Sequence, residues 1–359
     1  MTKGNKETKA KAGNAGAVEA VVATTRTHGE NTVLQWAACD TLGHMSMGHA
    51  DNVVKAGNVG AVEAVVAAMR THREYLNLQY AAYATLTHFS QADNRAKAGN
   101  AGAMEAVVAV MRTYREDAEL QQAACVTLLR IANNADNRTK AGNAGAVEAV
   151  VAAMRTHRED ATLPRGGQKG AQLGVLIITL VCLTTDNADN KAKAGNAGAI
   201  DTVVAAMQGH IEHTEMQWAA CQALTVMATD SVDNGTRAGS AGAVEAVVAV
   251  MRTYGEDARL QQHACAALSS MTMRNTDNRV KAIIAGAVEA VMVVMHLHAA
   301  KVSGRLETPA KTMRYLTGGN AKYVLHAGNT GAVDAVVAVL RRHSGTAKLQ
   351  AFANRVCFT

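Results

Sequence analysis

Residues 140–151 read Lys-Ala-Gly-Asn-Ala-Gly-Ala-Val-Glu-Ala-Val-Val, and close copies of this stretch return along the 359-residue chain. In each copy the second glycine is followed by Ala, by an aliphatic residue or Met, and then by Glu or Asp. Successive copies of this glycine lie 44, 42, 43, 53, 44, 44 and 45 residues apart. Such a period is typical of helical units that stack and share one elongated core. The sequence therefore predicts an all-α solenoid of about eight repeats. The glycines are Gly16, Gly60, Gly102, Gly145, Gly198, Gly242, Gly286 and Gly331.

We expect one continuous domain, residues 1–359, because each repeat of a solenoid rests on its neighbours. The single wide spacing of 53 residues places a loop insertion at 161–170, which is Gly-rich and basic. The insertion lacks the full phosphate-loop pattern, so we expect no nucleotide site there. The expected repeats are about 8–50, 51–92, 93–135, 136–188, 189–232, 233–276, 277–318 and 319–359.

Repeat 93–135 shows the plan of one unit. The pair Asp93-Asn94 is expected to open a short first helix, because both side chains can accept hydrogen bonds from free backbone amides. Gly99 and Gly102 are expected to form a corner, since glycine tolerates left-handed or otherwise strained backbone. A second helix follows, and a third runs from Leu120 with apolar residues at spacings of three and four. We therefore expect three helices per repeat.

The charged columns of the second helices suit the helix dipole. An acidic residue such as Glu105 stands in the first turn, and an arginine such as Arg112 often stands in the last. The position after the last turn alternates between His72-type and Tyr114-type residues, so it does not specify a metal ligand. Every carboxylate column is repeated, whereas catalysis needs one asymmetric constellation. We expect no enzyme activity, no cofactor and no metal site.

Composition bounds the partners. Lys and Arg exceed Asp and Glu by 6, but no long single-sign block marks a nucleic-acid or membrane arm. We therefore do not expect nucleic-acid binding, although an aligned lysine column leaves it as a third possibility. The column consists of Lys55, Lys97, Lys140, Lys193 and Lys281.

Four of the six cysteines share one repeat position, which predicts a small buried apolar column rather than disulfides or a zinc site. They are Cys39, Cys125, Cys221 and Cys265. A reducing compartment, cytoplasm or nucleus, is expected. The start of the chain is lysine-rich without an apolar run, so we expect no signal peptide. The apolar run 175–183 is too short to span a bilayer, so we expect no membrane insertion.

The unit resembles the armadillo repeat, in which a short first helix meets two longer helices at a glycine-containing corner. The corner Lys140 to Val151 and the third-helix stretch Leu120 to Leu128 carry the resemblance. The family's usual corner proline is replaced here by Glu or Asp in every copy. The resemblance covers nearly the whole chain and implies a right-handed superhelix whose third helices line a concave groove that binds extended peptides.

In the importin-like branch of the family, a Trp and an Asn four residues later project from each third helix. Here the Trp place holds Asp40 or Gln222 and the Asn place holds His44, His88 or Arg130, so that ladder is lost. The residues at these two positions differ between repeats, while the core positions of the repeat stay constant. This variation is expected for a binding surface, and it is equally expected for exposed positions whose sequence is unconstrained. The aromatic residues Trp36, Tyr80 and Trp218 share another third-helix position, where contact with a partner or partly buried packing are both possible.

We therefore expect a non-catalytic scaffold or adaptor that binds an extended peptide or a partner helix along the groove. The alternative is a structural subunit of a larger assembly that uses its edges, ends and loops. The candidate contact residues are Trp36, Asp40, His44, Tyr80, His88, Gln122, Arg130, Trp218, Gln222 and Gln262.

Overall fold

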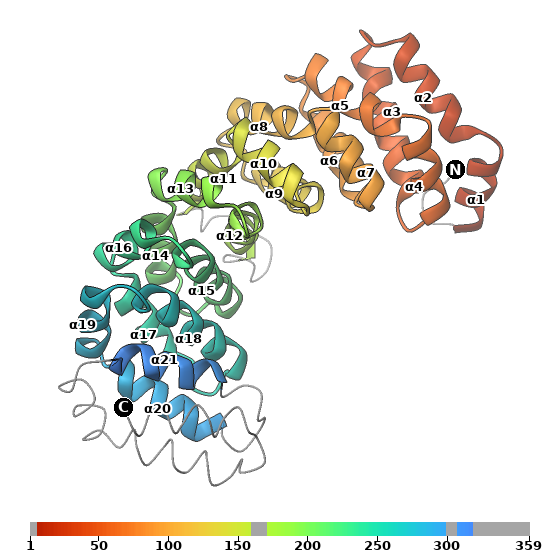
Figure 1. Ribbon diagram of the computed structural model, residues 1–359. Coiled ribbons are helices and arrows are strands. Elements are labelled where there is room, and N and C mark those ends of the chain that lie inside the picture. The colour runs from red at the N-terminus through yellow and green to blue at the C-terminus, as the bar shows by residue number, and fades with distance from the viewer. Residues whose placement is uncertain (1–5, 159–170, 299–306, 319–359) are drawn as a thin grey trace. The chain divides into compact units, whose positions relative to one another are not determined.

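The computed structural model describes residues 6–158, 171–298 and 307–318 of the chain. Twenty-one helices and no strand are found in these residues, which confirms the all-α class (Figure 1). The helices follow one another in groups of three along the sequence, as the repeat plan predicts. The predicted insertion at 161–170 and the predicted eighth repeat at 319–359 lie outside the described residues.

The helices of each group differ in length. The first helices are α1 (Lys6–Asn14), α4 (Ala50–Asn58), α7 (Ala92–Asn100), α10 (Ala135–Ala144), α13 (Ala188–Asn196), α16 (Val232–Ser240) and α19 (Thr276–Ile284). The second helices are α2 (Ala17–Thr27), α5 (Ala61–Thr71), α8 (Ala103–Thr113), α11 (Ala146–Thr156), α14 (Ala199–Gly209), α17 (Ala243–Thr253) and α20 (Ala287–His298). The third helices are α3 (Thr32–Ser46), α6 (Leu76–His88), α9 (Ala118–Ile131), α12 (Ala171–Thr184), α15 (Thr214–Ala228), α18 (Ala258–Thr272) and α21 (Glu307–Thr317).

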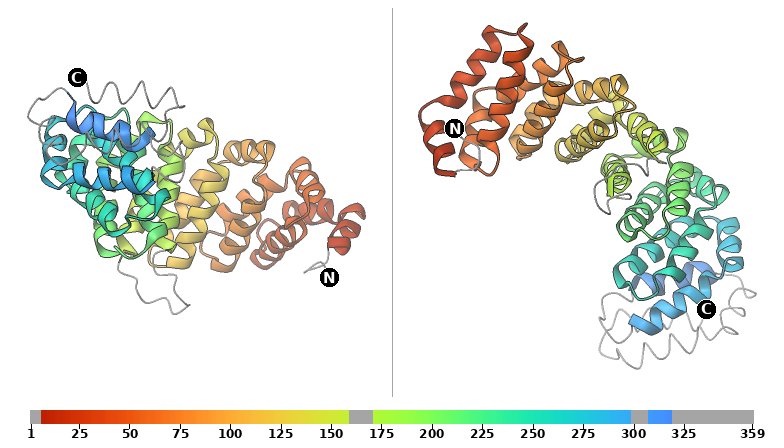
Figure 2. Two further views of the ribbon diagram at one scale, coloured as in Figure 1. Left: turned by 90° about the horizontal axis from the view of Figure 1, so that it is seen from below. Right: turned by 180° about the vertical axis from the view of Figure 1, so that it is seen from behind.

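The chain divides into two compact units, each described here by itself. The first unit is Met1–Asp160 with Ile178–Lys193, and the second is Ala161–Ile177 with Ala194–Thr359. In the first unit the third helices α3, α6 and α9 pack side by side, and in the second unit α15, α18 and α21 do the same (Figure 2). Threonine hydroxyls join neighbouring third helices. Thr85 Oγ1 donates to the carbonyl of Cys39 at 2.7 Å in the first unit, and Thr312 Oγ1 donates to that of Cys265 at 2.9 Å in the second.

The second glycine of the corner has the predicted left-handed backbone. Its φ lies between 73° and 85° in all seven described copies. An L-residue with a Cβ atom is strained in this region, whereas glycine is not. This glycine stands directly before the second helix, so it sets the direction in which that helix leaves the corner.

The first glycine of the corner was predicted to form part of the turn, and this was wrong. Gly99 lies inside α7 with helical backbone, and a Cβ atom there would overlap the Oδ1 atom of Asn137 in the next repeat. The same relation joins five further pairs of glycine and asparagine along the chain. The first glycine is therefore needed for close approach between repeats.

The Asp-Asn pair was predicted to cap the first helix, and this was also wrong. The cap stands earlier: Asn134 Oδ1 accepts from the Asn137 amide at 2.8 Å. The Asn137 side chain is instead fully buried, and its Nδ2 donates to the carbonyls of Arg95 at 2.8 Å and Ile131 at 2.7 Å. Both carbonyls belong to the preceding repeat, so the asparagine joins neighbouring repeats. The buried asparagines are Asn52, Asn94, Asn137, Asn190, Asn234 and Asn278.

Two further columns hold the frame together. Gln121 is buried, and its Nε2 donates to the carbonyls of Met111 and Tyr114, both at 2.8 Å, so it joins the end of the second helix to the third. The arginine in the last turn of the second helix lies where the helix dipole favours a cation, as predicted, but its side chain also bonds to the next repeat. Arg70 Nη2 donates to the carbonyl of Gly102 at 3.0 Å.

The cysteine column is buried, as predicted. Cys39, Cys125, Cys221 and Cys265 are 0% exposed, and each is a free thiol. Burial raises the pKa of each of these thiols to about 12, because the thiolate would lose its hydration. The column therefore packs as small apolar side chains.

Candidate partner-binding face

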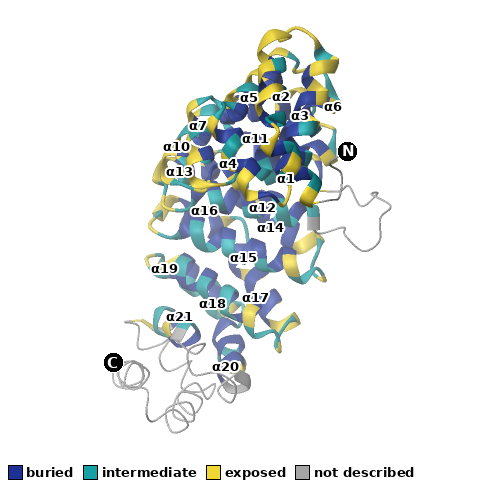
Figure 3. Ribbon diagram, turned by 90° about the vertical axis from the view of Figure 1, so that its right-hand side faces the viewer, coloured by how far each residue is buried: buried dark blue, intermediate teal, exposed yellow. Residues whose placement is uncertain are grey.

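The predicted contact residues all lie on third helices, and all are exposed or half-buried. Figure 3 colours the ribbon by burial, and the helices carry buried segments beside intermediate and exposed ones. We call these positions the third-helix face of each unit. In the first unit they are Trp36, Asp40, His44, Tyr80, His88, Gln122 and Arg130, and in the second unit they are Trp218, Gln222 and Gln262.

In the first unit, Asp40 and His44 stand one turn apart on α3. His44 Nε2 lies 3.5 Å from Asp40 Oδ1, and both side chains are partly exposed. His88 holds the equivalent position on α6, and its pKa lies below the usual value. Burial is the main cause, and the nearby charges of Lys9 and His44 add to it. An additional positive charge is thus disfavoured at His88.

Tyr80 contacts the next repeat. Its hydroxyl donates to Asp117 Oδ1 at 3.0 Å, and the same carboxylate caps α9 by accepting from the Leu120 amide at 2.9 Å. The pKa of Tyr80 is well above its usual value because of burial, the hydrogen bond to Asp117 and the charges of Asp117 and Glu119. The phenol therefore stays protonated and holds the Asp117 cap in place.

Trp218 of the second unit also contacts the next repeat. The Arg259 guanidinium lies 4.3 Å from the centre of the Trp218 ring, and the His263 ring meets it edge-on at 5.4 Å. Such a cation over an aromatic ring is attractive. Trp218 Nε1 is buried and has no hydrogen-bond partner among the described residues. Burial and, secondarily, Arg259 lower the pKa of His263.

The three glutamines have a different environment from the aromatic residues. Gln122, Gln222 and Gln262 are half-buried, and their side chains form no hydrogen bond to another residue in the described part of the chain. Their amide groups can therefore donate to and accept from a partner backbone without breaking an internal bond.

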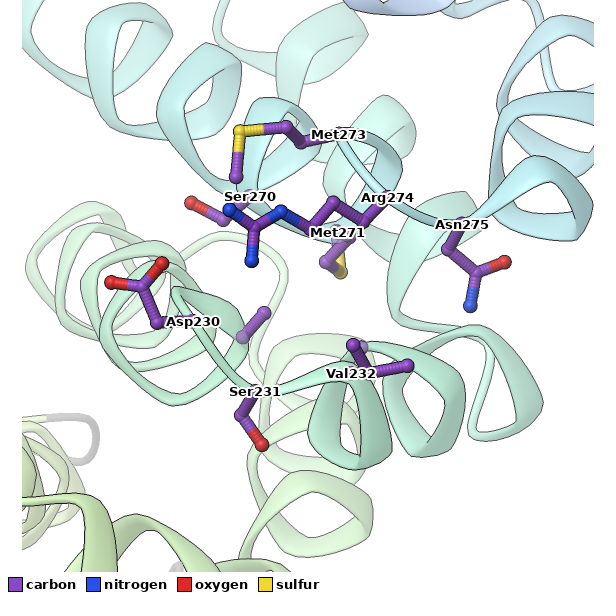
Figure 4. Close-up of a pocket in the computed structure, with 10 residues that line it drawn as sticks. Asp230, Ser231, Val232, Ser270, Met271, Met273, Arg274 and Asn275 are labelled. Atoms are coloured by element: carbon purple, nitrogen blue, oxygen red, sulfur yellow. The ribbon is translucent and has the colours of Figure 1, made fainter.

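A pocket in the second unit escaped the sequence analysis (Figure 4). It lies where α15 and α18 end, and Ser270 of α18 is one of its lining residues. Asp230 and Arg274 bring opposite charges to it, and the Arg274 side chain extends toward Asp230. Val232, which is 60% exposed, adds an apolar wall. Asp230 has φ 57°, an uncommon value for a residue other than glycine, and Asp186 at the same repeat position has φ 50°.

The lysines that suggested nucleic-acid binding donate hydrogen bonds to neighbouring repeats. Lys55 Nζ donates to the carbonyl of Gly13 at 3.0 Å, and Lys193 Nζ donates to that of Gly142 at 2.7 Å. These carbonyls lie in the last turn of the preceding first helix, where a cation is favoured. The column therefore supports neighbouring helix ends.

Neither a metal cluster nor a membrane span is found in the described residues. They contain no group of three or more His, Cys, Asp or Glu side chains arranged to hold a metal ion. None of the helices in the described ranges has both the length and the apolar composition needed to cross a bilayer.

No protein-family model and no curated protein matches the sequence. Solved structures do match. An engineered protein is 19% identical with a TM-score of 0.66, over 99% of this chain and 92% of that chain. A second engineered protein is 23% identical with a TM-score of 0.59, over 72% of this chain and 99% of that one.

A third structure comes from work on a phosphorylation switch that controls the interaction between cadherin and beta-catenin. It is 18% identical with a TM-score of 0.71, over 95% of this chain and 60% of that chain. At these identities the likeness concerns the fold. With 21 helices in groups of three in its described residues, the chain is a helical repeat protein.

Proposed function

We propose that this protein is a non-catalytic, armadillo-type scaffold whose third-helix face binds an extended peptide or a helix of a protein partner. The right-handed superhelix of about eight copies belongs to the same proposal. One observation carries this proposal. Side chains on the third-helix face differ between copies of the repeat, whereas buried residues of the same helices recur from copy to copy. Asp40 and Gln222 hold the same repeat position, whereas Gln35 and Gln217 just before them are identical and buried.

The solved structures support this assignment by analogy. The structure with a TM-score of 0.71 comes from work on an interaction between two proteins, cadherin and beta-catenin. Repeat scaffolds of this kind present extended surfaces to their partners. A reducing compartment, cytoplasm or nucleus, suits the five free thiols of the described residues.

The face is tested best at its glutamines. Tyr80 and Trp218 contact neighbouring repeats, so changing them also disturbs the frame. Gln122, Gln222 and Gln262 form no such bond within the described ranges. Partners are first captured with the wild-type chain and identified by mass spectrometry, and binding of the purified partner is then measured.

A triple Gln→Arg variant at these positions should weaken binding at least about tenfold, since three long charged side chains would block the face. The matched control places arginine at Ala23, Ala67 and Ala249, which are exposed on the second helices α2, α5 and α17. Equal affinity for wild type and the folded triple variant would reject this face.

The alternative, a structural subunit that uses its edges and ends, is favoured by one observation. Leu34 on α3 is 37% exposed, whereas its equivalents Leu78 and Leu120 are fully buried. Cross-links mapped in the native complex separate the two functions, because contacts at Leu34 without contacts at Gln122 or Gln222 favour the alternative.

A further inference from the structure

A cavity of about 270 Å³ opens where the second helices α8 and α11 pack against each other in the first unit. Met111 and Ala153, which are 2% and 4% exposed, form its apolar lining together with Ala149 and Ala152. All of its lining residues belong to the first unit, and none of them is a predicted contact residue of the third-helix face. The cavity is therefore a separate feature of the molecule.

The side chain of Gln121 reaches this cavity from α9. Its Nε2 donates to the carbonyls of Met111 and Tyr114, both at 2.8 Å, so the amide is fixed with its oxygen turned away from these two carbonyls. In the described part of the chain no group donates to Gln121 Oε1. Gln121 is only 2% exposed, and its oxygen is thus a buried acceptor that a group inside the cavity can satisfy.

The other glutamines of this column show why the oxygen of Gln121 can be reached. The Oε1 atoms of Gln79, Gln217 and Gln261 are fully buried and accept no bond from the described residues. In the repeat that follows each of these three, a buried valine stands eight positions after the left-handed glycine. These valines are Val110, Val250 and Val294. Ala153 holds that position in the repeat that follows Gln121, and its shorter side chain leaves the oxygen open to the cavity.

Charged side chains stand at the rim of the cavity. Arg112 and Arg115 bring two guanidinium groups, and Glu148 brings one carboxylate. A Cβ atom on Gly145 would overlap the Arg112 guanidinium and would meet Glu148 Oε2 at 3.8 Å, so these two groups lie at the same corner. The net positive charge of the rim disfavours a cationic ligand. An anionic ligand is disfavoured at the base, where it would face the lone pairs of Gln121 Oε1.

We propose that this cavity binds an indole group, whose N–H donates to Gln121 Oε1 while its two rings pack against the alanines of α11. An indole is neutral, flat and largely apolar and carries one donor, so it matches both the lining and the acceptor. Since an apolar cavity of about 150 Å³ holds a benzene ring, a cavity of about 270 Å³ has room for two fused rings. A guanidinium of the rim can lie over these rings, which is an attractive contact.

The site goes beyond the proposed function, because its walls come from second helices. The indole can belong to a tryptophan side chain of a protein or to a free compound, since both present the same rings and the same donor.

The test uses the full chain and a fluorinated indole observed by fluorine NMR, so that the tryptophans of the protein do not interfere. Titration should show saturable binding. The N-methylated form of the same indole lacks the donor and should bind at least about tenfold more weakly. N-acetyltryptophanamide distinguishes the two sources of the indole, because it displaces the probe if a tryptophan side chain fits and leaves it bound if only a free compound fits.

Two variants locate the site. Ala153→Val introduces the valine that covers the glutamine in other repeats, and Ala152→Phe fills the cavity from an exposed position. Each should weaken binding of the fluorinated indole at least about tenfold. Ala249→Phe is the matched control and should bind as wild type, because Ala249 is exposed at the same repeat position as Ala152 but lies on α17 of the second unit.

Three results would overturn the proposed site. The first is the absence of saturable binding, and the second is equal affinity for the N-methylated indole, which would show that Gln121 Oε1 is not the acceptor. The third is wild-type affinity in either folded cavity variant, with folding checked by circular dichroism. If the indole fails to bind while the triple Gln→Arg variant still loses its partner, this site fails and the proposed function stands.

Discussion

The side chain of Asn137 occupies the space that a Cβ atom on Gly99 would need. Asn137 lies in α10 and Gly99 in α7, so the contact joins two successive repeats of the first unit. It makes glycine necessary near the end of a short helix, and within a helix glycine is otherwise unfavourable by about 1 kcal/mol relative to alanine. The pair links the most regular feature of the sequence to the packing of the repeats.

Gly99→Ala should therefore destabilise the protein by about 1–3 kcal/mol, although alanine is the better helix former. Chemical denaturation monitored by circular dichroism measures the change. Gly29→Ala is the control, because a Cβ atom on Gly29 meets nothing within 4 Å. In Asn137→Ala/Gly99→Ala the two costs should not add, since the alanine at residue 137 frees the space. Additive costs would contradict the contact.

The sequence shows the same pairing, because the first glycine and its matching asparagine are both replaced in one pair of repeats. In the repeat of α19 the first glycine is replaced by Ile283. The position that would hold the matching asparagine in the following copy is Tyr323, eight residues before Gly331. Glycine and asparagine are thus lost together. Aligning the copies of the repeat with one another is therefore enough to link the two columns.

Gln261→Leu should lower the free energy of unfolding by about 1–3 kcal/mol, because it removes the two hydrogen bonds that the buried Gln261 amide donates to backbone carbonyls. Gln261 Nε2 donates to Met251 at 2.7 Å and Tyr254 at 2.8 Å. The neighbouring Gln262→Leu is the control and should change stability by less than about 0.5 kcal/mol. Thermal or urea unfolding of both variants measures this. Equal losses would show that the bonds of Gln261 contribute little.

The buried thiols should resist modification in the folded protein. Burial raises the pKa of Cys125 and Cys221 to about 12, so only about one thiol in ten thousand is ionised near pH 8. Labelling with a disulfide reagent followed by peptide mapping should find Cys182, which is half-buried, modified before either of them. Rapid labelling of Cys125 in native buffer would contradict the packing of this column.

Tyr80→Phe should cost about 0.5–1.5 kcal/mol, the usual contribution of one hydrogen bond. Because the folded-state pKa of Tyr80 is raised, the stability linked to its proton is present below about pH 10 and is lost as the pH rises further. The difference between wild type and Tyr80→Phe should therefore shrink in strongly alkaline buffer. A difference that stays constant up to alkaline pH would exclude the bond to Asp117.

The sequence predicted the helices better than the contacts between them. Helix periodicity and the left-handed glycine such as Gly102 act within one repeat, so they can be read from adjacent residues. Asn137 and Arg70 bond to residues of a neighbouring repeat, 42 and 32 positions away. Sequence reasoning assigned both to local roles. Only the packing of whole repeats shows which carbonyl each one reaches.

The candidate face was predicted in part. Third helices with half-exposed, variable side chains were expected, but the contacts of Tyr80 and Trp218 with the next repeat were not decided by their spacing. The pocket beside Ser270 was missed because it depends on the left-handed backbone of Asp230. The repeat alignment does carry a signal for it: Gly48 and Asp186 stand four residues before a buried asparagine, as Asp230 does, and both also have left-handed backbone.

Site-specific photocross-linking tests the central claim most directly. A benzophenone side chain at Gln122 or Gln222, on the third-helix face of each unit, should cross-link to the captured partner. The same group at Ala67 or Ala249, exposed on second helices, should not. Cross-links that form from the second helices and are absent from both glutamine positions would contradict the account.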